Sequence, residues 1–566
     1  MENTLKTKQE LLEEIERLKR QLKFLKAQKK YGLVWEDEKV QEQVVVDCQT
    51  KLPILREEKE KAIITDREKP FNILIEGDNY HALSVLNYTH EAKVDVIYID
   101  PPYNTGNKDF IFNDKYVDAE DAYRHSKWLS FMEKRLKLAK NLLKDTGVIF
   151  ISIDDNEMAQ LKLLMDDIFG PNNFVAIFPR KSGIAPRIDA KYISVEHDYV
   201  ICYSKDINLL KLNRMSMVED KSYNYMDEFA NIRGKFKLNK LDRGSIHYSE
   251  SLVFPIEAPD HTLIWPGGTK GRPNWTWRWS KEKVAWGIQN KYIVFKKTKS
   301  GWSVYFKQYQ YVDNEGNPIN RTIPFKSIIL DFPNEQGNRE LENIFHKRVF
   351  DYPKPVNLIK FLIRLLENRN ALILDFMAGT GTTGHAVLDL NQEDGGQRTF
   401  ILCTNNENNI CSEVCYPRLS KVIQGYKNLK GEEIKGLGGN LIYFKTDLLN
   451  IDSISHVSDE EKIKLTYQAG EMIALREGTF IEVEKNDWWQ IFKDHSKYTA
   501  IYFKENKLRL KELVSKLLRL KGKVALYIFS WGKNEYKNEF AGYPNIKVED
   551  IPEPIIDVYK KINSIL

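Results

Sequence analysis

The sequence lacks any long hydrophobic run. No apolar stretch among its 566 residues approaches the roughly 20 residues that a membrane-spanning helix needs. The first segment, MENTLKTKQELLEEIERLKRQ, is charged throughout. We therefore expect a soluble, cytoplasmic protein that makes no membrane contact.

Cysteine is scarce and shows no pattern. The chain has five cysteines, and they form no CxxC pair and no Cys/His set with the spacing of a zinc site. They are Cys48, Cys202, Cys403, Cys411 and Cys415. We expect no metal site, and free buried thiols in a reducing compartment.

A strong charge of one sign is also missing. The 85 basic and 80 acidic residues leave a formal net charge of +5, so a nucleic-acid surface would have to come from local clusters of charge. Hydrophobic residues make up 42% and charged residues 29% of the chain, which is a globular balance. The length predicts roughly three or four folded units.

Hydrophobic spacing predicts the order of these units. Leu or Ile at positions 11, 15, 18, 22 and 25 follows the heptad seam of a coiled coil, so residues 1–65 are predicted to be helical, contacting either a second chain or their own protein. FNILIEGDNYHAL, VDVIYIDPPYN and GVIFISIDDNE are strand-like, with a helical stretch over 123–144. ALILDF and RTFILCT continue this alternation further on. The fold class is therefore α/β, with a parallel sheet and crossover helices.

Two further regions interrupt or follow this alternation. Between residues 206 and 345 lie six of the eleven tryptophans, interleaved with lysine and arginine. This composition predicts an inserted domain, and the alternative is a tryptophan-rich β core with solvated lysines. Residues 436–566, which begin at the turn GLGGN, are predicted to form a separate α/β or α+β domain.

A glycine turn (residues 376–384) lies between a strand and a helix in ALILDFMAGTGTTGHAV. Its glycines allow close approach of the backbone to a ligand, and the helix that follows offers free N–H groups. Gly379, Gly381 and Gly384 match the dinucleotide pattern G-x-G-x-x-G. However, the next strand ends in Thr404 and not in the acid that binds a ribose in Rossmann proteins, so a nicotinamide cofactor is poorly supported. A GxxxxGK[ST] loop is absent, which disfavours nucleotide triphosphate hydrolysis.

The second turn is DPPYNTG, directly after the apolar run VDVIYI. Pro101 and Pro102 donate no hydrogen bonds and hold the chain extended. The Asp100 carboxylate and the Pro101 carbonyl can therefore accept hydrogen bonds from a ligand, with Tyr103 beside it. Such a site suits a planar ring with an exocyclic amine, such as adenine or cytosine. The alternative is a proline-ended strand with a helix-capping aspartate and a surface tyrosine.

The two turns together resemble the motifs of the amino-methyltransferases that use S-adenosylmethionine to methylate DNA bases. Those enzymes carry D/S-P-P-Y/F/W and F-x-G-x-G, and DPPY comes first here, which is the circularly permuted order of the β class. KKYGLVWE, VEHDYVICYSK, YPKPVNLIK and ICSEVCYPRL resemble the modification (Mod) subunits of Type III restriction–modification systems. The resemblance implies a Rossmann-like methyltransferase core in two parts, 66–205 and 346–435, around a target-recognition domain at 206–345.

The resemblance also implies an activity. We expect methyl transfer from S-adenosylmethionine to adenine N6 in double-stranded DNA, by a homodimer that works with a helicase–nuclease (Res) subunit. The N-terminal heptads and the C-terminal domain are candidates for these protein contacts. The alternatives are cytosine-N4 methylation, an adenine methyltransferase without a nuclease partner, and a recognition subunit without chemistry.

Residue roles follow from the matched motifs. Asp100 and the Pro101 carbonyl would accept the hydrogens of the target amine, with Pro102 holding the turn and Tyr103 stacking on a base flipped out of the duplex. On the cofactor side, the candidates are Asp78 for the adenine edge, Lys354 and Pro355 for closing the methionine pocket, Asp375 for the amino group, and Gly379, Gly381 and Thr382 for the methionine part. Met377 stands where the family has Phe, and Thr404 where many relatives have an acid.

Overall fold

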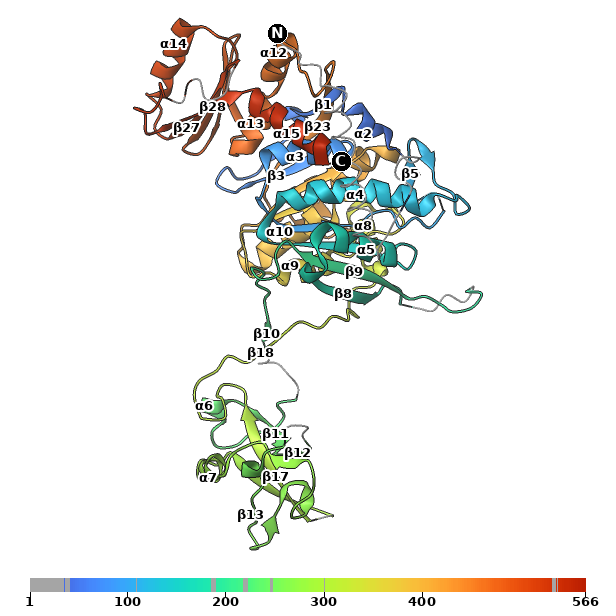
Figure 1. Cartoon of the computed structure of the whole chain (residues 1–566), viewed down its shortest axis with the longest axis vertical. Helices are drawn as coiled ribbons and strands as arrows, with labels where there is room; N and C mark the ends of the chain where they lie inside the picture. Colours follow the sequence, from blue (N-terminus) through green and yellow to red (C-terminus); the bar gives the residue numbers. More distant parts are fainter. Residues whose placement is uncertain are drawn as a thin grey trace, which may run out of the picture. The chain divides into compact units, whose positions relative to one another are not determined.

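The computed structural model describes residues 35, 41–107, 109–184, 190–216, 222–244, 248–299, 301–531, 536 and 538–565. These fall into two compact units, shown in Figure 1. Unit 1 comprises the chain up to Leu212 and from Ser327 onward, and unit 2 comprises Asn213–Lys326. The heptads at 11–25 lie outside the described residues. Within the described part, no helix combines the length and the apolar character needed to cross a bilayer.

A ten-stranded sheet forms the centre of unit 1. In spatial order its strands are β1 (Lys51–Glu57), β23 (Asn440–Asn450), β3 (Phe71–Glu76), β20 (Thr399–Thr404), β19 (Leu372–Asp375), β4 (Val94–Ile99), β7 (Leu143–Ile153), β9 (His197–Ser204) and β8 (Phe174–Lys181), with β2 (Ile63–Ile64) beside β23. Neighbours from β23 to β7 run parallel, and β1, β9 and β8 are antiparallel to their neighbours. The predicted α/β class is confirmed, with a mixed sheet.

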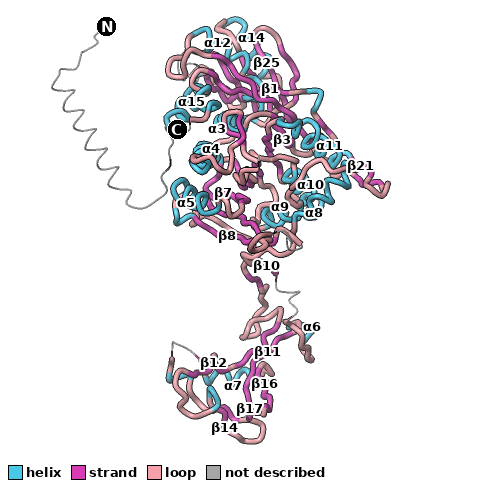
Figure 2. The backbone as a smooth tube through the Cα atoms, turned by 90° about the vertical axis from the view of Figure 1, so that its right-hand side faces the viewer, coloured by secondary structure: helices cyan, strands magenta, loops and turns pink. Residues whose placement is uncertain are grey.

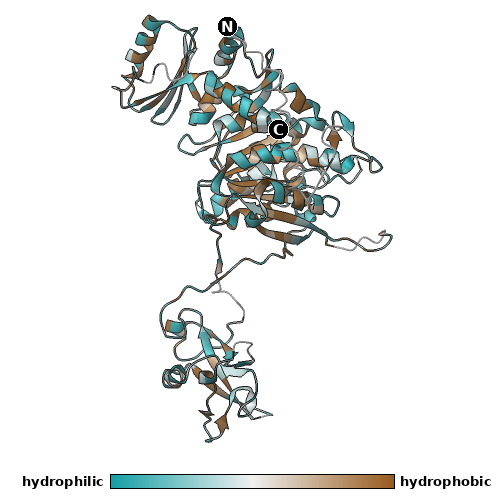
Figure 3. Cartoon of the chain, in the orientation of Figure 1, coloured by the Kyte–Doolittle hydropathy of each residue, from teal (hydrophilic) through white to brown (hydrophobic). Residues whose placement is uncertain are grey.

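Helices cover both faces of this sheet. Figure 2 shows α3 (Asn79–Thr89), α4 (Arg124–Leu142) and α5 (Met158–Phe169) along one face, and α8 (Asn334–Phe345), α9 (Val356–Arg364), α10 (Thr382–Asp394) and α11 (Tyr416–Gln424) along the other. Because both faces are covered, the central strands are hydrophobic over most of their length (Figure 3), and every residue of β4 is buried.

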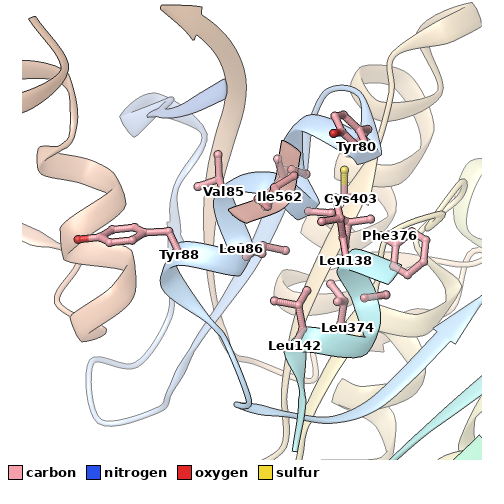
Figure 4. Packing of buried hydrophobic residues seen from close by; sticks show 14 of the residues in the cluster. Tyr80, Val85, Leu86, Tyr88, Leu138, Leu142, Leu374, Phe376, Cys403 and Ile562 are labelled. Atoms are coloured by element: carbon pink, nitrogen blue, oxygen red, sulfur yellow. The ribbon is translucent and has the colours of Figure 1, made fainter. Parts of the chain in front are cut away.

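Helix α3 is almost entirely buried in unit 1. Its residues 82–89 are all buried, which explains why its sequence shows little helical amphipathicity. Tyr80, Val85, Leu86 and Tyr88 of α3 belong to the same cluster as Leu138 and Leu142 of α4 and Ile562 of α15 (Glu553–Ile565), as Figure 4 shows. The C-terminal helix therefore helps to complete the central core.

The C-terminal region is only partly distinct from the core. Residues 440–450 form β23 of the central sheet, although the sequence suggested that a separate domain begins at 436. An apolar run predicts a strand but does not indicate which sheet the strand joins. Beyond it come α12 (Asp459–Gln468), α13 (Gly470–Glu477), α14 (Lys507–Leu517) and a second, five-stranded sheet of β24 (Ile481–Lys485), β25 (Trp489–Asp494), β26 (Lys497–Tyr502), β27 (Lys523–Phe529) and β28 (Ile546–Ile551).

Unit 2 has a hydrophobic core of its own. The three-stranded antiparallel sheet of β11 (Phe236–Lys240), β17 (Gly301–Tyr309) and β16 (Ile293–Thr298) packs with α7 (Lys281–Gln289). Trp277 and Trp279 are buried in this core, and Trp286 and Trp302 pack against it. Most of the tryptophans that marked the region therefore serve packing. The sequence extended the insertion to residue 345, whereas α8 belongs to unit 1.

The remaining α-helices and strands are short. They are α2 (Gln43–Asp47), β5 (Ile111–Phe112), β6 (Lys115–Tyr116), β10 (Met215–Ser216), α6 (Ala230–Arg233), β12 (Asp242–Gly244), β13 (Ile256–Glu257), β14 (Leu263–Ile264), β15 (Trp275–Trp277), β18 (Thr322–Ile323), β21 (Gly425–Lys427) and β22 (Glu433–Lys435).

Candidate active site

Four predicted site residues meet at one edge of the central sheet. Strands β3, β20, β19 and β4 are adjacent and parallel, so their carboxyl ends lie side by side. Asp78 follows β3, Thr404 ends β20, Asp375 ends β19 and Asp100 follows β4. From β19 the chain continues through α10 to β20, and from β4 it continues through α4 to β7 on the other side. Ligands of open α/β sheets bind where neighbouring connections diverge in this way.

The glycine turn adopts the backbone conformation that its sequence predicts. Gly379 and Gly381 have φ angles of 49° and 76°, in the left-handed region. A Cβ placed on Gly379 would meet nothing within 4 Å, whereas one on Gly381 would lie 3.0 Å from the Cys415 sulfur. Gly379 therefore borders open space that a ligand can approach, and Gly381 allows close packing beneath the turn.

Asp375 holds the turn in shape. Its Oδ1 accepts a hydrogen bond from the backbone N–H of Met377 at 3.0 Å, and its Oδ2 accepts one from the Thr383 hydroxyl at 2.5 Å. Burial raises the pKa of Asp375 to about 7, although both hydrogen bonds favour the ionised form. Met377 takes part in this contact through its backbone N–H, so the hydrogen bond to Asp375 does not depend on the side chain at position 377.

The Lys354 ammonium lies beside the DPPY turn. It is 2.8 Å from both carboxylate oxygens of Asp100 and 4.9 Å from the centre of the Tyr103 ring. The Lys354 side chain is 9% exposed and that of Asp100 28% exposed, so the pair is largely shielded from water. The sequence assigned Lys354 to the methionine pocket together with Pro355, which sits just before α9. The observed contact is with DPPY.

The polar groups of Pro101, Pro102 and Tyr103 differ in whether another residue of the protein already forms a hydrogen bond with them. The Pro102 carbonyl accepts a hydrogen bond from the Trp128 indole N–H at 2.7 Å. Among the described residues, no donor reaches the Pro101 carbonyl, and the buried Tyr103 hydroxyl has no partner. Burial and the nearby Asp100 raise the pKa of Tyr103, so it remains a neutral phenol. A free acceptor and an unpaired hydroxyl therefore lie next to Asp100.

Asp78 and Thr404 occupy the β3–β20 side of the edge. One oxygen of Asp78 caps α3 by accepting a hydrogen bond from the Tyr80 N–H at 2.7 Å. The Thr404 carbonyl accepts a hydrogen bond from the Gly77 N–H at 3.0 Å, which joins the ends of the two strands. The Asp78 side chain is 33% exposed, which leaves it accessible to a ligand on this edge.

Two residues that support the DPPY turn, Asn104 and Glu157, were not predicted from the sequence. Asn104 is fully buried with a φ of 56°, and its side-chain N–H group donates to Glu157 at 2.5 Å and to the Arg124 carbonyl at 3.2 Å. Burial raises the pKa of Glu157. The signal was present in the sequence, because an asparagine directly after DPPY suits a left-handed turn position. Its partner in the DDNE segment could not be inferred from spacing.

A family model described as DNA methylase matches residues 94–414, which is more than half of the chain. The chain is 33% identical over 390 residues to the Type III restriction–modification enzyme StyLTI Mod subunit of Salmonella typhimurium, covering 63% of this chain and 57% of that relative. It is 31% identical over 398 residues to the EcoPI Mod subunit of Escherichia phage P1, covering 62% and 60%. With the Type II methyltransferase M.KpnI of Klebsiella pneumoniae, identity is 35% over 351 residues, covering 58% of this chain and 79% of the relative.

These relatives confirm the resemblance to Mod subunits, and the match spans 57% and 60% of the two Mod relatives' length. Among solved structures, a putative DNA modification methylase from Thermus thermophilus complexed with S-adenosyl-L-methionine aligns with a TM-score of 0.29 at 14% identity, covering 62% of this chain and 93% of that one. The PvuII DNA methyltransferase (cytosine-N4-specific) aligns with a TM-score of 0.33 at 11% identity, covering 64% and 95%.

Proposed function

Since this chain belongs to the DNA methylase family, we propose that it transfers a methyl group from S-adenosylmethionine to adenine N6 in double-stranded DNA. One observation carries the proposal. The glycine turn and DPPY, which are far apart in the sequence, follow adjacent parallel strands, so a cofactor site and an amine-acceptor site adjoin at one edge. The proposed core has the circularly permuted motif order.

The cofactor side of this edge fits S-adenosylmethionine. Gly379 borders open space and Gly381 is in the left-handed region, so the turn can bind the methionine part closely. Asp375 retains a second lone pair on each oxygen for an amino group. Asp78 has an accessible carboxylate for the adenine edge, and Thr404 lies between these two positions on β20. When bound, the cofactor supplies an electrophilic methyl group on sulfonium.

The residues on the DPPY side would activate the amine. Its lone pair is delocalised into the base ring, and hydrogen bonds from its two N–H groups to the Asp100 carboxylate and the Pro101 carbonyl would favour tetrahedral geometry. Lys354 fixes the orientation of that carboxylate through its contact with both oxygens. Tyr103 would stack on the flipped base, which replaces part of the lost stacking, worth about 1–3 kcal/mol per base.

Calorimetry and product analysis test this function. Titration of the full chain with S-adenosylmethionine should show binding, and a recognition subunit without chemistry would show none. Incubation with duplex DNA followed by digestion to nucleosides and mass spectrometry should yield N6-methyladenine. If the product were N4-methylcytosine, the target base would be cytosine instead of adenine, and the proposed hydrogen-bond acceptors Asp100 and Pro101 would keep their role.

We further propose that unit 2 recognises the DNA target and that the protein acts as the modification subunit of a Type III system, as a homodimer with a Res helicase–nuclease. The relatives' names and the exposed basic residues of unit 2 support this. Methylome sequencing of a host expressing the chain would give the recognition sequence. Co-purification with a Res subunit, and the mass measured by light scattering, would separate this assembly from a methyltransferase that acts alone.

A further inference from the structure

Arg418 of α11 forms hydrogen bonds with the glycine turn from its buried side. It is fully buried, and its Nη1 donates to the hydroxyls of Thr382 and Thr380 at 2.8 and 3.1 Å. These threonines flank Gly381, whose φ of 76° sets the direction of the turn. One guanidinium group therefore fixes both sides of the left-handed residue.

Glu340 of α8 connects this arginine to a different segment. Its Oε2 lies 3.8 Å from Arg418 Nη2 and accepts a hydrogen bond from the backbone N–H of Val356 at 3.0 Å. Val356 is the first residue of α9 and follows Lys354 and Pro355 directly. A single carboxylate oxygen thus lies between the arginine below the glycine turn and the segment that carries Lys354.

Helix α8 also contacts the Lys354 segment through its backbone. A Cβ on Gly337 would lie 2.3 Å from the Pro353 carbonyl oxygen and 3.0 Å from that of Lys354, so only glycine fits there. One turn earlier, Asn334 accepts a hydrogen bond from Arg180 at 2.8 Å. Positions 334, 337 and 340 lie on one side of α8. This side of the helix therefore sets the position of the backbone from which Lys354 reaches Asp100.

The Glu340–Arg418 pair is poorly explained by stability alone. Burial lowers the pKa of Arg418 and raises that of Glu340, so leaving water disfavours the charged form of each group. At 3.8 Å, their contact is longer than a charge-assisted hydrogen bond, which limits how far it offsets the loss of hydration. Arg418 is fully buried and the Glu340 side chain is 23% exposed, and in some proteins an ion pair shielded from water selects one geometry.

We propose that Glu340 and Arg418 are positioning residues that hold the glycine turn and the Lys354–Asp100 contact in a fixed relation. This inference rests on the proposed function. Neither side chain is assigned to the amine or the cofactor. Together they would ensure that the turn that binds the cofactor and the carboxylate that accepts the amine are correctly placed at the same time.

Two conservative variants test the coupling. Glu340→Gln keeps an acceptor for the Val356 N–H but removes the charge facing Arg418. Arg418→Lys keeps the positive charge, but a lysine ammonium lacks the planar guanidinium and cannot contact two hydroxyls and a carboxylate at the same time. Each should weaken S-adenosylmethionine binding by roughly tenfold in calorimetry, and the double variant should lose less than the product of the two effects, because neighbours in one network are not additive.

The matched control is Arg398→Lys. Arg398 is also buried and forms two hydrogen bonds with an aspartate, Asp394, but at the far end of α10 from the glycine turn. The Arg398→Lys substitution should lower the melting temperature of the protein without changing its dissociation constant for S-adenosylmethionine. Wild-type affinity in both test variants, or an equal loss of affinity in the control, would overturn the proposal.

Hydrogen exchange separates this proposal from the proposed function. Without any cofactor, Glu340→Gln should speed amide exchange both in the glycine turn and in residues 350–358, whereas Arg398→Lys should leave both segments protected. If the wild-type chain binds no S-adenosylmethionine, the proposed function fails, and this exchange pattern still decides the coupling. Faster exchange in only one of the two segments contradicts it. Glu340→Gln carries the test alone if Arg418→Lys does not fold.

Discussion

Two cations near the sheet edge of unit 1 are buried. Lys354 contacts both oxygens of Asp100, and Arg418 lies beneath the glycine turn. On unit 2, Lys270 and Arg272 are exposed and lie over indole rings, with the cation 5.5 and 4.9 Å from the ring centre. Buried, paired charges keep one geometry and are little affected by salt, whereas exposed ones are available to phosphates and are screened. If the proposed roles hold, with chemistry at the edge of unit 1 and DNA contact on unit 2, substitutions in the two units should respond differently to salt.

The largest effect should come from Asp100→Ala. Loss of the carboxylate that accepts the amine hydrogen should lower the methylation rate about a thousandfold or more, as for other preorganised electrostatic groups. Tyr103→Ala should lower the rate less, by roughly ten- to a hundredfold, because the lost stacking is worth about 1–3 kcal/mol per base. Radiolabelled methyl transfer measures both, and a gel-shift assay should show DNA binding retained. Normal turnover in either variant would remove DPPY from the active site.

The pH dependence of cofactor binding tests the burial of charge at the edge. Asp375, with a pKa of about 7, is ionised above that pH and protonated below it. A cofactor ammonium favours the ionised form, so affinity for S-adenosylmethionine should fall roughly tenfold per pH unit below 7 and level off above it. Calorimetry at several pH values measures this. Asp375→Asn should bind weakly at all pH values, and a wild-type affinity independent of pH between 5.5 and 8 would contradict this role.

The exposed cations of unit 2 should behave in the opposite way. Lys270→Ala or Arg272→Ala should weaken DNA binding several-fold and reduce the slope of log K against log salt by about one for each lost phosphate contact. Fluorescence anisotropy at several salt concentrations measures both quantities. Lys291→Ala is the matched control, because this lysine of unit 2 is already paired with Glu228 at 2.5 Å. An unchanged slope in the first two variants would argue against a phosphate-binding surface there.

Local patterns predicted the two turns and the strands that carry them. An apolar run that ends in glycine or proline determines its own structure, and adjacent parallel strands then bring the residues after them to one edge. The contact between Lys354 and Asp100 spans 254 positions, and no periodicity reports such a pairing. The sequence therefore placed Lys354 among the cofactor-binding candidates but could not show its contact with Asp100.

The same limit explains the other differences. Helix α8 was grouped with the tryptophan-rich insertion because it follows that insertion in the chain. Its place in unit 1 depends on tertiary contacts, such as the space that Gly337 leaves for the Pro353 carbonyl. Likewise, β23 is recognisable as a strand, but its pairing with β3 depends on which edge of the sheet is open to it. Element type is a local property, whereas partner choice is not.

The smallest effect should come from Met377→Phe, which restores the family residue. Because Asp375 accepts its hydrogen bond from the backbone of residue 377, either side chain leaves that contact in place. The Met377 side chain packs partly buried against the core, and a flexible methionine can be replaced by a ring of similar volume with modest repacking. We expect a dissociation constant for S-adenosylmethionine within about threefold of wild type by calorimetry, and an unchanged methylation rate. A loss larger than that of Glu340→Gln would mean that the side chain at 377, and not the backbone of the turn, shapes the cofactor site.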